Sequence, residues 1–238
     1  MRKSIITLMT AFAFCASLNL HANTTEVHPG YTVETINEGY HMDGCHPDMC
    51  CQTHQLCDAV RPFQLALYNP YQFVDQTTSI YGMRLNLIYG VNDKVKGLDL
   101  GLINSVCHNM LGLQAGVWNQ VSGELCGLQA GVFNEVCGKA MGWQYGVVNV
   151  ASSVYGGQTG GVNIAHCELA GIQAGAYNYA HCANGFQVGV VNQCYGIEGV
   201  QIGVINWAAE LRGVQIGLVN CLVGCECFRI LPVMNFAW

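Results

Sequence analysis

Two copies of one tripeptide hold the side chains best suited to bind a metal ion or to form a disulfide. Ala165-His166-Cys167 recurs as Ala180-His181-Cys182, fifteen residues later. If the two segments lie on stacked strands, their Cα atoms are about 4.8 Å apart. Three interpretations are then open: a duplicated turn with buried cysteines, a Cys167–Cys182 disulfide, and a two-His, two-Cys metal site. We expect no metal and no other cofactor, and His166, Cys167, His181 and Cys182 are the candidates if a metal binds.

A second group of cysteines and histidines lies in residues 23–61, which have no repeat and no clear period. Their spacing, C-x4-C-C-x5-C, lacks the C-x2-C pairs of the common zinc modules. We interpret this segment as a Cys/His-rich leader that is pinned by disulfides and partly disordered. A metal site is the alternative.

No motif for catalysis is present. The sequence has no G-x-S-x-G, no Walker loop and no H-E-x-x-H. The repeats hold few acidic residues; Glu124 and Glu210 lie between repeated segments, and no pair of carboxylates stands out. We therefore expect no catalytic residues and no enzymatic activity.

The element that positions all these side chains is a repeat, G-x-Q-x-G-x-x-N, which occurs nine times within residues 97–220 at intervals of 14 or 15 residues. Every copy keeps both glycines, and only the first replaces Gln, by Asp99. The predicted structural residues are the asparagines, at Asn104, Asn119, Asn134, Asn149, Asn163, Asn178, Asn192, Asn206 and Asn220.

Within each repeat, residues alternate in polarity with the two-residue period of a β-strand. The positions six, four and two before the Asn, and two after it, are mostly apolar, as in Leu113, Ala115, Val117 and Val121. We expect these to share the buried face with the Asn. The opposite face then carries an exposed Gln column and bulky residues such as Trp118, which would form a binding strip together with Phe133 and Tyr177.

Two all-β architectures fit such repeats. In a parallel β-solenoid each repeat is one coil, and the asparagines form a hydrogen-bonded ladder. In a closed antiparallel outer-membrane β-barrel each repeat is one strand. Residues 62–69, 82–92 and 228–238 then bring the total to about twelve strands. We favour the solenoid, because a ring of amides facing lipid is costly and because the segments between repeats do not alternate in character.

The chain begins with the features of an export signal. Arg2 and Lys3 precede an apolar run, and Leu20-His21-Ala22 resembles a cleavage site. We divide the chain into a signal peptide (1–22), the leader (23–61) and a β-repeat domain (62–238). This domain has degenerate first units at 62–96, regular repeats at 97–227 and a terminal strand at 228–238. In an exported chain, the 14 cysteines favour disulfides.

The repeated phrase, together with GMRLNLIYGVN (82–92) and LPVMNF (231–236), resembles a bacterial family of surface-repeat proteins. The resemblance implies an exported protein of the outer membrane or cell surface, with the periplasm as another location, and supplies no catalytic residues. We expect a non-enzymatic envelope scaffold with an unknown surface ligand or envelope component as partner; membrane association stays open. The alternative is a barrel acting as a pore or structural protein. The net charge of −6 argues against nucleic acid.

Overall fold

The computed structural model describes residues 59–224 and 227–237. The predicted signal peptide and residues 23–58 of the predicted leader lie outside this part of the chain. The described residues all belong to one compact unit, Met42–Trp238.

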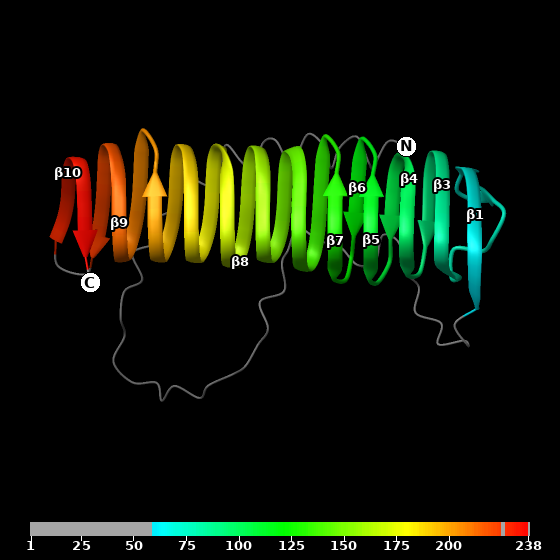
Figure 1. The fold of residues 1–238 in the computed structure, drawn as a ribbon. Coiled ribbons are helices and arrows are strands. Elements are labelled where there is room, and N and C mark those ends of the chain that lie inside the picture. The colour runs from blue at the N-terminus through cyan, green and yellow to red at the C-terminus, as the bar shows by residue number, and fades with distance from the viewer. Residues whose placement is uncertain (1–58, 225–226, 238) are drawn as a thin grey trace, which may run out of the picture. The chain divides into compact units, whose positions relative to one another are not determined.

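The described chain is built from strands that wind into a row of coils (Figure 1). The strands are β1 (Val60–Tyr68), β2 (Tyr71–Gln72), β3 (Ser79–Asn92), β4 (Val95–Val106), β5 (Met110–Ala115), β6 (Trp118–Val121), β7 (Leu125–Ala130), β8 (Phe133–Ile202), β9 (Ile205–Gly224) and β10 (Cys227–Ala237). β8 contains 70 residues and several coils, because pairing with neighbouring coils continues around the corners.

Neighbouring coils are parallel and pair repeat against repeat. Asn104 pairs with Asn119 across β4 and β6, and Asn119 pairs with Asn134 across β6 and β8. The fold is therefore a parallel β-solenoid of about ten turns, as the repeat spacing predicted. The alternative of an antiparallel barrel is wrong, because consecutive repeats run in the same direction and stack on one another.

Each end of the stack departs from the regular coil. At the N-terminal end β1 pairs parallel with β3, and the short β2 pairs antiparallel with β1. At the C-terminal end β10 pairs antiparallel with β9, so the last strand reverses the direction of the chain. Such segments cover the unpaired edges that would otherwise template pairing with another chain.

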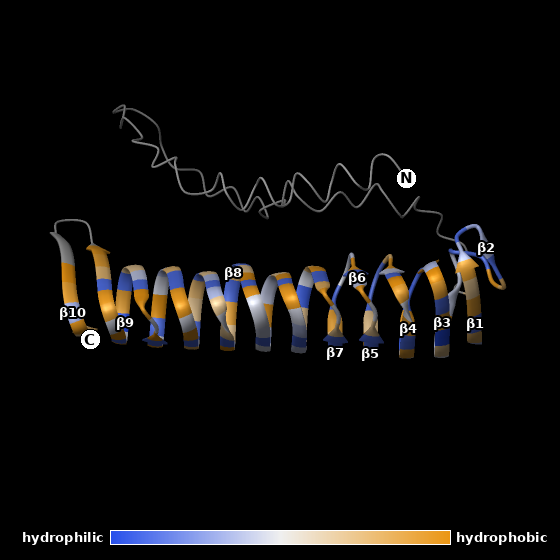
Figure 2. Cartoon of the chain, turned by 90° about the horizontal axis from the view of Figure 1, so that it is seen from above, coloured by the Kyte–Doolittle hydropathy of each residue, from blue (hydrophilic) through white to orange (hydrophobic). Residues whose placement is uncertain are grey.

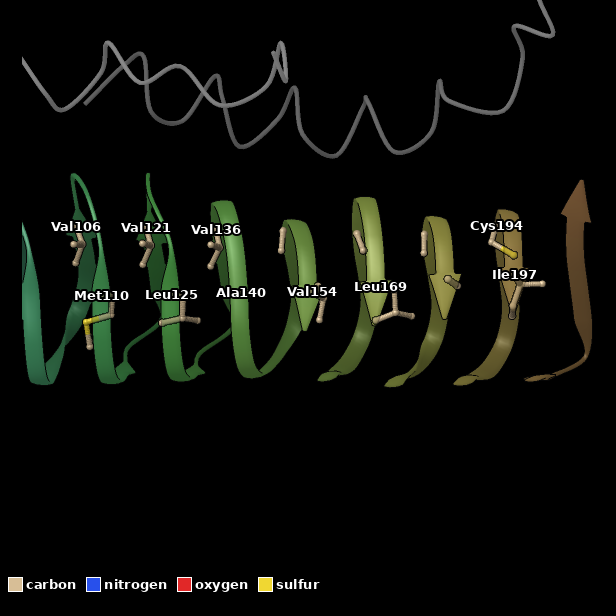
Figure 3. Packing of buried hydrophobic residues seen from close by; sticks show 14 of the residues in the cluster. Val106, Met110, Val121, Leu125, Val136, Ala140, Val154, Leu169, Cys194 and Ile197 are labelled. Carbon is tan, nitrogen blue, oxygen red and sulfur yellow. The ribbon is translucent and has the colours of Figure 1, made fainter. Parts of the chain in front are cut away.

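The apolar part of the interior consists of two columns of buried side chains, which form two rows in Figure 3. One column lies two residues after each Asn and includes Val106, Val121 and Val136. The other faces it from the opposite side of the coil and includes Met110 and Leu125. Full burial of one such aliphatic side chain contributes roughly 1.5–3 kcal/mol.

The first glycine of each repeat is required by the close stacking of the coils. Gly112 has a φ of 131°, and a Cβ added there would lie 2.1 Å from the carbonyl oxygen of Gly97 in the preceding coil. Only glycine adopts this backbone conformation readily. Gly123, near the other corner of the coil, does not have positive φ; among the glycines of the described repeats, positive φ occurs at the first glycine of each repeat.

The predicted orientation of the first half of each repeat is wrong. The Gln column is fully buried, as at Gln114, whereas Val117 is 50% exposed. The chain turns a corner at the second glycine, as at Gly116 and Val117 between β5 and β6. Strict alternation is not preserved across a corner, so residues before it face inward on the opposite parity from residues after it.

Candidate functional site

The predicted Asn column forms a continuous ladder inside the solenoid. Each Asn from Asn104 to Asn206 donates a side-chain hydrogen bond of 2.8–2.9 Å to the Asn of the next coil. The second amide hydrogen of each goes to a backbone carbonyl at 2.8–3.1 Å. All nine asparagines are fully buried. Satisfying both donors offsets the cost of burying an amide.

A second ladder, made by the Gln column, runs in the opposite direction. From Gln129 to Gln215, each Gln donates a bond of 2.7–2.8 Å to the Gln of the preceding coil. Donation therefore points toward the C-terminal end in the Asn ladder and toward the N-terminal end in the Gln ladder. Hydrogen bonds in such chains polarise one another.

Asp99 terminates the Gln ladder at its N-terminal end. Its Oδ2 accepts a hydrogen bond of 2.9 Å from Gln114. Gln114 is the first Gln of the ladder, so the preceding coil offers it Asp99 as the acceptor in place of a Gln. On the other side the carboxylate accepts two bonds, of 2.7 and 2.6 Å, from the guanidinium of Arg84. Both side chains are fully buried, and Arg84 also donates to the carbonyl of Ser105 at 2.9 Å. The replacement of Gln by Asp in the first repeat thus supplies an acceptor that can also pair with Arg84.

Strand β10 terminates both ladders at the C-terminal end. Asn220 donates to the carbonyl of Leu231 at 3.1 Å, and Asn235 donates to the free acceptor of Gln215 at 3.0 Å. Both contacts come from the strand that reverses direction. The interior of the described coils therefore holds the two amide ladders and the apolar columns, together with the buried Arg84–Asp99 pair.

The duplicated tripeptides lie on neighbouring coils, since Asn163 bonds to Asn178 in the same register. Both histidines are exposed, and His181 stacks on Tyr195 with ring centroids 5.2 Å apart. Cys167 and Cys182 are free thiols in the structure and lie on these neighbouring coils; their disulfide stays a prediction. Among the described residues, no group of three His, Cys, Asp or Glu could hold a metal.

Burial shifts the pKa of several groups on the coils, and two of these shifts are large. Burial raises the pKa of the Cys194 thiol to about 12. This thiol lies in the apolar column two residues after Asn192 and accepts a contact of 3.3 Å from Gln201, so it behaves as a small core side chain. Burial also raises the pKa of the Glu135 carboxyl to about 7.

The predicted aromatic strip is only partly assembled. Trp118 and Phe133 lie on neighbouring coils with ring centroids 4.5 Å apart. Tyr177 lies three coils further along and donates a hydrogen bond of 2.9 Å to Gln193. The Gln column does not belong to this surface, because it is buried.

The surface that the sequence analysis missed is an apolar face on the outside of the solenoid. It is formed by the positions six, four and two before each ladder Asn. Figure 2 shows that apolar residues recur from coil to coil. The position two before the Asn is the most exposed, with 42–71% of the residue accessible at Leu102, Val117, Val132, Val147, Val190, Val204 and Leu218.

This apolar face carries no charged side chain in any of the nine described repeats. It continues onto β3 through Met83 and onto β10 through Met234 and Phe236, which are exposed. Charged side chains appear at one margin of the face, at the position eight residues before the Asn. There the Nζ of Lys96 lies 4.3 Å from the centroid of the Tyr81 ring. Monomeric proteins rarely expose contiguous apolar surface of more than a few hundred Å², so this face is the candidate functional site.

None of the described residues belongs to a helix long and apolar enough to cross a membrane. Comparison with known proteins found no match to a family model, to a curated protein or to a solved structure. The class of protein is therefore defined by the fold and the surface alone. It is a parallel β-solenoid with two buried amide ladders and an uncharged apolar outer face.

Proposed function

We propose that this chain is an exported, non-enzymatic scaffold of the bacterial cell envelope or cell surface, and that it acts by presenting its apolar face to another component. The observation that carries the proposal is the absence of charge on this face across nine repeats, beside charged residues at one margin. Protein interfaces have such an apolar centre with a polar rim.

The interior of the described coils supports a scaffold in preference to an enzyme. Both ladders and both apolar columns run through the stack, so the described interior offers no pocket for a substrate. A hollow lined by Cys182, Glu198 and Arg212, among others, lies outside the apolar face. In it Glu198 and Arg212 already pair with one another at 2.9 Å.

The resemblance to surface-repeat proteins and the apolar start of the chain support export. The pore function that formed the alternative depended on the barrel architecture and is not proposed.

The test is to express the full chain in a bacterium, to separate cytosol from envelope, and to identify the N-terminal peptide by mass spectrometry. The expected result is an envelope-bound chain that begins at Asn23. A chain that keeps Met1 and stays in the cytosol would contradict the proposal.

The role of the face is tested in the same fractions. Val132→Glu with Val190→Glu places two charges on it, and we expect this variant to be released from the envelope by a mild wash. Ser122→Glu with Tyr195→Glu places the same charges three residues after the Asn, outside the face, and should stay bound. Equal retention of the two variants would contradict a role for the face.

A further inference from the structure

The length and width of the apolar face match what a stable protein–protein interface requires. About ten turns at a spacing of ~4.8 Å, and ~17 Å of chain from the position six before the Asn to the corner at the position two before it, give roughly 800 Å² of surface that wraps onto the corner. A stable interface buries about 800 Å² on each partner. The face is therefore large enough to hold a folded partner by itself.

The repeat makes the face complementary to another copy of itself. Its side chains stand in rows separated by the coil spacing, and only a partner with the same spacing can keep its rows in register with them along the whole length. Two sheets pack in this way with about 10 Å between them. An isologous contact between two copies uses the same patch on both.

The contour of the face is also self-complementary. Tyr145 and Val147 are prominent, with 45% and 57% of their surface exposed. The next coil carries the smaller residues Thr159 and Gly161 at the same two positions. Its outer surface therefore protrudes less, and we call it the lower coil. A two-fold axis parallel to the strands, between these coils, places the prominent coil of each copy on the lower coil of the other.

Other partners fit the face less well. A membrane surface rich in anionic lipid is bound through clusters of Lys and Arg. The described part of the face has none, and the whole chain carries a net charge of −6. A small ligand requires a concave site with convergent polar groups, and the outward positions of the nine repeats supply no charged group to orient one.

We infer that two copies of this chain associate through their apolar faces, sheet against sheet. This inference rests on the proposed function, because it uses the same apolar face. It identifies the partner as a second copy of this chain. The dimer buries side chains that are exposed in the single chain, and it leaves the charged margin at the rim.

Sedimentation of the purified full chain over a wide range of concentration tests the inference, with a non-reducing gel to exclude covalent dimers. The expected result is a non-covalent dimer. Val132→Glu with Val190→Glu should weaken dimerisation by at least about a hundredfold, because the charges are buried without partners. The matched control, Ser122→Glu with Tyr195→Glu, should dimerise like the unmodified chain. Thr159→Trp fills the lower coil and should also weaken the dimer.

Three results would overturn the inference. They are a monomer at all concentrations, a dimer that the charges on the face do not weaken, and a monomer that floats with phosphatidylcholine vesicles, which would make lipid the partner. A Thr159→Trp dimer as tight as that of the unmodified chain would contradict the position of the two-fold axis. A cytosolic, uncleaved chain would contradict export only, so the two proposals fail separately.

Discussion

The buried pair of Arg84 and Asp99 gives the sharpest prediction about stability. Gln64, Arg84, Asp99 and Gln114 occupy successive positions of one inward column. Replacing Arg84 by Gln leaves the buried carboxylate without its cation, and replacing Asp99 by Gln leaves the buried guanidinium without its anion. Breaking a buried pair from one side costs roughly 3–5 kcal/mol, and we expect this loss in the free energy of unfolding for each single variant.

The double variant, Arg84→Gln with Asp99→Gln, should recover most of that loss. It extends the Gln ladder to Gln64, whose buried Oε1 has no hydrogen-bond partner at present. The glutamine introduced at position 84 would donate to this oxygen and accept a bond from the glutamine introduced at position 99. Replacing a buried ion pair as a unit is often neutral or stabilising, so the double variant should be more stable than either single variant by at least ~3 kcal/mol.

The assay is denaturant unfolding followed by far-UV circular dichroism, with amide hydrogen exchange to locate the change in the first coils. Arg212→Gln is the matched control, because it breaks an ion pair that is 77% and 58% exposed and should change stability little. Single variants as stable as the unmodified chain, or a double variant that loses the sum of the single losses, would refute the proposed role of Asp99 as the end of the ladder.

Three further predictions follow from the packing and the shifted pKa values. Gly142→Ala should cost more than about 2 kcal/mol in unfolding free energy, because φ is 134° and the new Cβ would lie 2.0 Å from a carbonyl oxygen. Gly196→Ala, where nothing lies within 4 Å, should not. The raised pKa of Glu135 means that the unfolded chain releases its proton first; stability should therefore fall by roughly 2–3 kcal/mol as the pH rises from 4.5 to about 7. Glu135→Gln should abolish that fall in pH-dependent unfolding. In the folded chain, the exposed Cys182 should react with a thiol reagent at mildly alkaline pH, whereas Cys194, whose pKa is raised by burial to about 12, should not react until the chain unfolds.

The architecture was predictable from the sequence because the repeat is strict. A fixed interval between asparagines specifies the register between neighbouring coils. In parallel coils this register places each Asn beside the Asn of the next coil, and Asn119 donates a hydrogen bond to Asn134. The Asn ladder and the placement of Cys167 and Cys182 on neighbouring coils followed from that spacing alone. The same spacing could not specify which residues face inward on both sides of a corner.

The orientation error had a physical cause. The parity that Leu113 and Val117 share with the Asn predicts an interior position for both, but the chain turns a corner at Gly116 and Val117, before Asn119, and the alternation is broken there. The same parity places Gln114 outside, although a long amide can satisfy its hydrogen bonds inside when an identical neighbour lies one coil away. The replacement of Gln by Asp99 was visible in the sequence. Its structural role depends on the ion pair with Arg84, which lies outside the regular repeats.

The two ladders of Asn and Gln side chains inside the stack of parallel coils can be observed by nuclear magnetic resonance of the side-chain amides. We expect cross-peaks between the amide groups of Asn119 and Asn134 and between those of Gln129 and Gln144, all exchanging slowly with water. Gln amides that exchange rapidly, without cross-peaks to the Gln fifteen residues away, would contradict this expectation.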